Sequence, residues 1–217
     1  IQLRAILRAS ALYPEIRIVY PLISDVKELR EVNAFLEPLT GFQAKAVSGY
    51  VPTFLFFDSL KKRQFPTTIT IRDSKNLSYL PEPDIFHDVF GHVPLLTNPI
   101  FADYMEAYGK GGMRAIEFDS LKELARLYWY SVEFGLISQN NQLKIYGAGI
   151  LSSSGETVYS IDSDVPKRIP YKIKTIFDTP YIKDHYQAQY FVIDSYEDLF
   201  HSIPFIEQEL EKRMTLK

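Results

Sequence analysis

The stretch Pro81-Glu-Pro-Asp-Ile-Phe-His-Asp-Val-Phe-Gly-His-Val-Pro-Leu-Leu96 holds two of the four histidines in this chain of 217 residues. Its opening predicts the start of a helix. Proline suits a first helical turn, and the two carboxylates beside Pro81 and Pro83 suit the positive end of a helix dipole. The helix that follows carries His87 and His92, five residues apart.

This spacing is awkward for a metal pair on a regular α-helix. Residues five apart are turned about 140° from each other, whereas metal-binding pairs favour the aligned i, i+4 relation. Both rings meet one ion only if the helix bends, bulges or ends between them, and Gly91 with Pro94 marks where this can happen. The spacing alone leaves open a simpler alternative, in which His87 and His92 are two ordinary histidines of a helix.

A second segment, Tyr128-Trp-Tyr-Ser-Val-Glu-Phe134, brings one acid into mostly apolar surroundings. A carboxylate among rings is costly to bury unless it is paired or bound to metal. Two histidines and one carboxylate on one side of an ion leave its other positions open, as in non-haem Fe(II) oxygenases. The alternative for Glu133 is an ion pair with a Lys or Arg. The other histidines, His185 and His201, have polar neighbours and are expected at the surface.

The composition narrows the class of protein. Apolar residues make up 46% of the chain and the net charge is -3, which favours one soluble globular domain over 1–217. No basic run suggests nucleic acid, and no apolar run suggests a membrane span. The chain has no cysteine, so any metal must be held by histidine and carboxylate. Lacking a signal-peptide core in its first twenty residues, the protein is expected in the cytoplasm.

In the rest of the chain, the spacing of apolar residues predicts a mainly helical α+β fold with a few short strands. Apolar spacing of three and four predicts helices over 26–39, 54–62, 99–109 and 120–136. The glycines at 109, 111 and 112 are expected to end the third helix, and Ser120 with Glu123 to cap the fourth. Alternation predicts strands over 67–72 and 190–193, before a helix that Ser195 caps and Pro204 interrupts.

Three segments in this order and spacing, 81–96, 128–136 and Tyr146-Gly-Ala-Gly-Ile-Leu-Ser-Ser153, resemble the tetrahydropterin-dependent aromatic amino acid hydroxylases. The similarity extends over about 20–200 and is strongest to the bacterial members that hydroxylate phenylalanine. It implies a single mainly helical α+β catalytic domain around a deep iron-containing cleft. It also implies an Fe(II) monooxygenase that uses O₂ and a tetrahydropterin, most simply to convert phenylalanine to tyrosine.

By this resemblance, His87, His92 and Glu133 are the iron ligands and, with Tyr128, form the catalytic set. Arg72 matches an arginine that holds the substrate carboxylate, a task for which a guanidinium fork is suited. The other matching positions are expected to contact the amino acid or the pterin, although the residues alone predict core or surface roles for most of them. The substrate set adds Pro83, Trp129, Phe134, Ser152, Glu156 and Val192. The pterin set is Val51, Phe56, Asp88 and Ala148.

The chain also departs from the animal members of this family. Tyr50–Phe54 replaces their polar pterin loop, and Leu80 replaces a threonine that touches the substrate. The tail after Pro204 is too weakly heptad-like to match their tetramerisation helix, so a monomer is expected. The alternatives are hydroxylation of tryptophan or tyrosine, a metal-dependent hydrolase and a non-catalytic binding protein. The chain has no His-Glu-x-x-His arrangement, which argues against the hydrolase.

Overall fold

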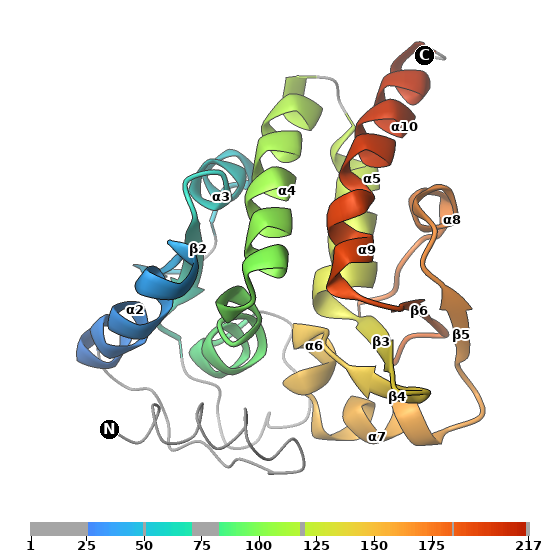
Figure 1. The fold of residues 1–217 in the computed structure, drawn as a ribbon, viewed down its shortest axis with the longest axis horizontal. Coiled ribbons are helices and arrows are strands. Elements are labelled where there is room, and N and C mark those ends of the chain that lie inside the picture. Colours follow the sequence, from blue (N-terminus) through green and yellow to red (C-terminus); the bar gives the residue numbers. More distant parts are fainter. Residues whose placement is uncertain (1–25, 50, 71–82, 118–119, 184, 216–217) are drawn as a thin grey trace.

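The computed structural model describes residues 26–49, 51–70, 83–117, 120–183 and 185–215. Within these ranges the fold is a mainly helical α+β domain with short strands in two small sheets, as predicted. Figure 1 shows a long central helix, α4 (Pro99–Glu117), with the segments before it on one side and the C-terminal helices on the other. No helix of the described part is long and apolar enough to span a membrane.

The segments before α4 form a small helix and strand unit. It contains α2 (Val26–Thr40), β1 (Gln43–Val47), α3 (Thr53–Leu60) and β2 (Gln64–Thr68). The two strands pair in parallel, in a register that runs from Gln43↔Gln64 to Val47↔Thr68. Helix α2 and its buried Leu29, Val32 and Leu36 confirm the prediction for this segment.

The larger sheet follows α5 (Leu121–Tyr128) in the chain. Its strands are β3 (Gly135–Gln139), β4 (Gln142–Ile145), β5 (Lys167–Pro170) and β6 (Gln189–Ile193), in the order β4-β3-β6-β5. Strands β3 and β4 form an antiparallel hairpin, whose turn residues Asn140 and Asn141 both have positive φ. The β3/β6 and β5/β6 pairs are parallel.

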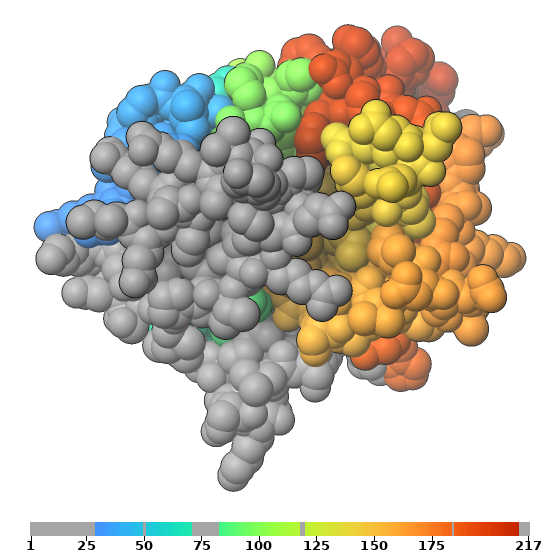
Figure 2. Space-filling view, turned by 60° about the horizontal axis from the view of Figure 1, so that its bottom comes forward, coloured from blue at the N-terminus to red at the C-terminus, as the bar shows by residue number. Residues whose placement is uncertain are grey.

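Five helices of the described part follow the β3–β4 hairpin in the chain. They are α6 (Ala148–Leu151), α7 (Ser154–Asp162), α8 (Ile173–Asp178), α9 (Tyr196–His201) and α10 (Ile203–Thr215). Of these, α7 contacts β4 and α9 contacts β6. In Figure 2, the yellow to orange surface of the β3–β4 hairpin and the helices after it lies opposite α2 (blue) on this face. The last two helices begin after Ser195 and Ser202, which agrees with the predicted cap at Ser195 and break near Pro204.

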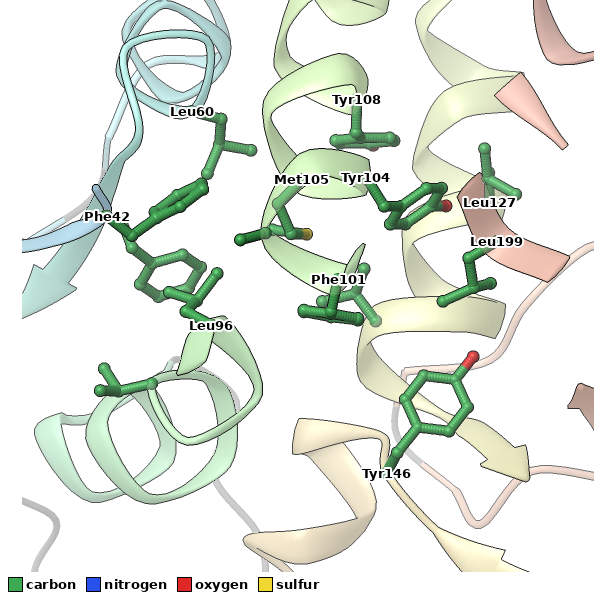
Figure 3. Packing of buried hydrophobic residues seen from close by; sticks show 14 of the residues in the cluster. Phe42, Leu60, Leu96, Phe101, Tyr104, Met105, Tyr108, Leu127, Tyr146 and Leu199 are labelled. Atoms are coloured by element: carbon green, nitrogen blue, oxygen red, sulfur yellow. The ribbon is translucent and has the colours of Figure 1, made fainter. Parts of the chain in front are cut away.

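The core is aromatic and lies on both sides of α4 (Figure 3). Phe101, Tyr104 and Met105 of this helix are fully buried. Strand β6 divides its side chains between two clusters, because successive residues of a strand point to opposite faces. Phe191 and Ile193 join the main core, while Tyr190 and Val192 face a smaller cluster that includes Phe134.

The predicted end of the third helix at its glycines is wrong, because α4 continues to Glu117. A Cβ at Gly109 would lie 2.4 Å from the backbone N of Lys61, and one at Gly112 would lie 1.9 Å from the Phe57 ring. These glycines therefore allow α3 to pack closely against α4. Gly111 has open space around its Cβ position.

Three other predicted boundaries also differ from the structure. The fourth helix does not reach residue 136, because Gly135 and Leu136 pair with β6 as part of β3. At the start of α5, the Ser120 side chain does not accept the capping hydrogen bond expected from a backbone N–H of the first turn. The strand predicted over 67–72 is β2, which begins earlier and ends at Thr68. Its buried residues pair with β1, whereas Ile69 is exposed.

Candidate metal centre

The two histidines lie on a short π-helical turn, η2 (His87–His92). A π-turn closes hydrogen bonds between residues five apart, as in the bond from Val93 N–H to the Asp88 carbonyl. This geometry brings the rings of His87 and His92 to the same side. Their Nε2 atoms are 3.0 Å apart, with the rings at 83°. The condition set by the sequence, that the helix must bend, bulge or end between the histidines for both rings to meet one ion, is met by this π-helical turn.

Gly91 allows this turn to lie close to the rest of the site. A Cβ at Gly91 would lie 2.8 Å from the Cβ of Ala148. The fully buried Ala148 begins α6, the short helix that also leads to Ser152. The glycine in the motif is therefore explained by close packing between η2 and α6.

A second π-helical turn, η4 (Trp129–Glu133), ends at the carboxylate. The N–H of Phe134 closes this turn by donating to the Trp129 carbonyl. Glu133 Oε1 lies 3.2 Å from His92 Nε2, and Oε2 lies 3.5 Å from His87 Nε2. Within the described residues the ion-pair contacts of Glu133 are these two histidines, not the Lys or Arg of the alternative interpretation.

The local charges favour a cation at this point. Burial opposes a charge on the His87 imidazole, but the carboxylates of Glu133, Asp88 and Asp84 together outweigh burial and raise the pKa of His87. Burial also opposes a charge on Glu133, yet the two histidines lower the pKa of its carboxyl well below the usual range. The carboxylate is therefore ionised and aimed at the two rings.

Ser152 fixes which nitrogen of His87 carries the proton. The Ser152 hydroxyl donates to the Ala148 carbonyl at 2.9 Å, so its oxygen is left to accept from His87 Nδ1 at 2.8 Å. With the proton on Nδ1, His87 Nε2 presents a lone pair toward His92 and Glu133. A hydrogen bond from the outer nitrogen is the usual way in which proteins orient a metal-binding imidazole.

His92 is held mainly by packing. Its ring packs against those of Phe65 and Tyr128, at centroid distances of 4.7 and 6.2 Å. Its Nδ1 is buried, and no described residue offers it a hydrogen bond. The two imidazoles therefore present the same nitrogen to the site by different means.

The spacing of the three groups suits a metal ion. Donor atoms bound at about 2.1 Å, with angles between octahedral and tetrahedral, lie about 3.0 to 3.4 Å from one another. Of the observed separations, 3.0 and 3.2 Å lie within this range and 3.5 Å lies just above it. His87, His92 and Glu133 are also a possible metal-binding group by mutual distance alone. Two imidazoles and one carboxylate match the ligand set of non-haem Fe(II) sites.

Asp88 connects this site to the first sheet. Its Oδ2 accepts the backbone N–H of Thr68, at the end of β2, at 2.7 Å. Burial raises the pKa of the Asp88 carboxyl, although both neighbouring histidines oppose the shift. Asp84 acts nearby, where its Oδ1 accepts the N–H of His87 at 2.9 Å. Both hydrogen bonds fix the start of η2.

The structure brings several of the predicted substrate residues together around Trp129. The rings of Trp129 and Phe134 are 4.6 Å apart, and Trp129 and Val192 both pack against the smaller apolar cluster. The buried Glu156 lies nearby, and its Oε1 accepts the hydroxyl of Tyr190 at 2.7 Å. Burial raises the pKa of this carboxyl.

The predicted pterin residues are more widely spread. Phe56 lies edge-on to Tyr128 at 5.6 Å, which places it beside the metal centre. Val51 is half-buried just before α3. The predicted substrate set also includes Pro83 and Arg72. Pro83 is exposed two residues before Ile85. Arg72 lies outside the described residues. The assignment of these residues to a pterin or an amino acid stays a prediction.

Sequence reasoning did not identify two side chains that contact Trp129. Tyr181 stacks on its indole at 4.5 Å, and Gln187 accepts the indole N–H at 3.0 Å. Both come from the irregular segment between α8 and β6, where no motif or periodic pattern marks them. Only the tertiary fold places them next to η4.

Fold and site together define a helical α+β domain with a candidate metal centre of two histidines and one carboxylate. The family model of the biopterin-dependent aromatic amino acid hydroxylases matches residues 20–217, and the chain belongs to this family.

Its relatives include phenylalanine-4-hydroxylases of Chromobacterium violaceum and Ralstonia nicotianae, with 51% and 53% identity over 175 residues. These matches cover 81% of this chain but only 59% and 56% of the relatives, so the chain spans less than two thirds of their length. A crystal structure of the Chromobacterium violaceum phenylalanine hydroxylase bound to cobalt aligns with a TM-score of 0.83 and 48% identity. That alignment covers 86% of this chain and 68% of the other.

Proposed function

We propose that the chain is an Fe(II)- and tetrahydropterin-dependent monooxygenase that hydroxylates L-phenylalanine to L-tyrosine with O₂. The observation that carries the proposal is the convergence of His87, His92 and Glu133 at metal-ligand distances. Family membership and the names of the bacterial relatives support the same activity. We further propose that the protein acts as a cytoplasmic monomer whose partners are small molecules.

The chain's own residues bind and orient the reactants. When bound, iron and the tetrahydropterin supply the electrons and oxygen activation that ring hydroxylation requires. Glu133, His87 and His92 would hold the iron as its protein ligands, and this set of three would leave positions for O₂ or substrate. The rings of Trp129 and Phe134 form an apolar wall beside η4 for the substrate ring. Phe56 is proposed to stack on the pterin, and Arg72 to hold the substrate carboxylate.

The preference between phenylalanine and tyrosine depends on whether the pocket residues offer a hydrogen-bond partner to the phenol oxygen of tyrosine. Val192 offers no hydrogen-bond partner, and an unpaired buried hydroxyl costs about 1 to 3 kcal/mol. Phenylalanine is therefore expected to exceed tyrosine by roughly five- to a hundred-fold in kcat/KM. An apolar pocket excludes tryptophan only by the size and shape of its ring. Tryptophan is therefore expected to compete with phenylalanine more strongly than tyrosine does.

The test measures oxygen uptake and amino acid products after the metal-free chain is loaded with Fe(II) and supplied with a tetrahydropterin. Tyrosine formation that requires iron and pterin together supports the proposal. Competition among phenylalanine, tyrosine and tryptophan at equal concentration checks the preference. Hydrolytic activity with Zn²⁺ and no oxygen uptake with iron would instead favour the metal-dependent hydrolase. A lack of both activities, with pterin still bound, would indicate a binding protein.

A further inference from the structure

Gln187 lies in the segment between α8 and β6 and is only 2% exposed. Its side-chain amide makes three hydrogen bonds. Oε1 accepts the indole N–H of Trp129 at 3.0 Å, while Nε2 donates to the carbonyls of Ile182 and His185 at 2.8 and 3.3 Å. The backbone N–H of Gln187 donates to Oε1 of Glu156 at 3.2 Å.

The orientation of this amide follows from its partners. Two carbonyl oxygens can face only the NH₂ group, and an indole N–H can face only an oxygen. The opposite orientation would set two donors against each other and leave two carbonyls facing an oxygen. A glutamine therefore satisfies all three groups at once, whereas a carboxylate would repel the carbonyls of Ile182 and His185.

The indole of Trp129 has three neighbours that constrain it in different ways. Phe134 and Tyr181 pack against its ring at 4.6 and 4.5 Å, with interplanar angles of 31° and 19°. Such contacts favour one plane for the ring, but two rotamers that differ by a half turn about the Cβ–Cγ bond share that plane. The directional hydrogen bond to Gln187 selects the rotamer whose indole N–H faces this amide.

We propose that Gln187 is a positioning residue, which sets the orientation of the Trp129 indole and so the shape of the amino acid pocket. The inference rests on the proposed function, because Trp129 is a wall of that pocket. Trp129 also begins the η4 turn that ends at the metal-binding Glu133. Through its backbone, Gln187 joins the same wall to the buried Glu156. One buried amide thus connects the segment after α8 with two parts of the site.

The single tryptophan of the chain permits a direct test. A ¹H–¹⁵N spectrum of the purified protein contains one indole N–H signal, which belongs to Trp129. In Gln187→Met, which keeps the length of the side chain without its polar atoms, this signal should move upfield and exchange faster with solvent. Gln187→Glu keeps an oxygen that can accept the indole N–H but loses the donors to the two carbonyls. Its signal should stay downfield, although the variant should be less stable than the native chain. Gln139→Met, at an exposed site of β3, is the matched control and should change nothing.

Steady-state kinetics then distinguish a positioning role of Gln187 in the amino acid pocket from a general loss of folded protein. Of the three side-chain hydrogen bonds that Gln187→Met removes, only the one to Trp129 acts on the pocket. The variant should therefore raise the KM for the aromatic amino acid about two- to tenfold, with kcat and the KM for pterin unchanged. An indole signal at its native position in Gln187→Met, or an unchanged amino acid KM despite a moved signal, overturns the proposal. If Gln187→Met does not fold, the native protein still decides, because an indole N–H that exchanges at the free-solvent rate contradicts the hydrogen bond.

The spectroscopic result does not depend on turnover. A native chain that hydroxylates no aromatic amino acid would reject the proposed function. The shift of the indole signal in Gln187→Met would then still establish the hydrogen bond, while the positioning role in substrate binding would be rejected with that function.

Discussion

At the level of single residues, the metal centre depends on the proton carried by His87 Nδ1. Ser152→Ala removes the oxygen that accepts this proton, so the ring loses both its preferred tautomer and its orientation. Metal affinity should fall about 10- to 100-fold, the usual cost of losing a hydrogen-bonding partner of a ligand. Calorimetric titration of the metal-free chain with Co²⁺ measures the change. Ser154→Ala, two residues along at an exposed site, should bind as the native chain does.

The carboxylate of Glu133 is expected to matter more than Ser152. Glu133→Gln keeps the shape of the side chain but removes the charge and one of two strong acceptor oxygens facing the histidines. Iron content after loading should fall further than in Ser152→Ala, and tyrosine formation should be lost with it. Glu156→Gln is the matched control, because this buried carboxylate bonds to Tyr190 and should leave metal content unchanged. Full iron content in Glu133→Gln would reassign this acid to a structural role.

Glu156 also makes the stability of the fold depend on pH. Burial raises the pKa of its carboxyl, so the folded state holds this proton to higher pH than the unfolded chain does. Stability from this group is present below the unfolded pKa and is lost as pH rises through the folded pKa. As pH rises from about 4, the free energy of unfolding of the native chain should therefore fall relative to that of Glu156→Gln. Urea unfolding at several pH values measures this difference, and a difference that is constant with pH would count against it.

At the level of elements, the contact between α3 and α4 depends on glycine. Gly112→Ala places a Cβ 1.9 Å from the Phe57 ring, so the two helices must separate. Overpacking of this kind lowers the free energy of unfolding by about 1 to 3 kcal/mol. This loss exceeds the stabilisation of up to about 1 kcal/mol expected from replacing glycine by alanine in a helix. Gly111→Ala, one residue earlier in open space, should instead stabilise by up to about 1 kcal/mol. Thermal unfolding of both variants gives the comparison, and equal effects would contradict the packing argument.

The same contact explains why the sequence misleads at this helix. A glycine run normally predicts a helix end, because glycine costs helical stability wherever a side chain would be tolerated. At Gly109 and Gly112 the deciding neighbours are Lys61 and Phe57, about fifty residues away in the chain. Local pattern cannot contain that information. Helix α2 was predictable because its apolar stripe is a local property of the segment.

The candidate metal ligands came from a different source, because the histidine spacing left two interpretations open and the family resemblance chose between them. Histidines are rare in this chain, and the five-residue interval between His87 and His92 fits a single ion only where the helix is irregular. The π-turn could be expected as a bulge, but its form depends on the fit of Gly91 against Ala148. Gln187 was not predictable, since a glutamine in an irregular segment carries no signal until the fold brings it to Trp129.

At the level of the whole molecule, the metal centre joins distant parts of the chain. The turn η2 precedes the central helix α4 and contacts β2, whereas η4 follows α5 and leads into the larger sheet. An ion held by both turns therefore links the segments on either side of α4 in Figure 1. A ligand that binds only the folded state adds stability in proportion to the logarithm of its concentration over its dissociation constant.

Co²⁺ at a hundred times its dissociation constant should thus add about 2.7 kcal/mol. For a domain of this length, that corresponds to a rise in Tm of roughly 5 to 10 °C. Mg²⁺ at the same concentration should give almost no shift, because it prefers oxygen ligands and the centre offers two nitrogens. Glu133→Gln should lose the response to Co²⁺ while its metal-free Tm changes much less. An equal rise with Mg²⁺, or an undiminished rise in Glu133→Gln, would place the stabilising ion elsewhere on the molecule.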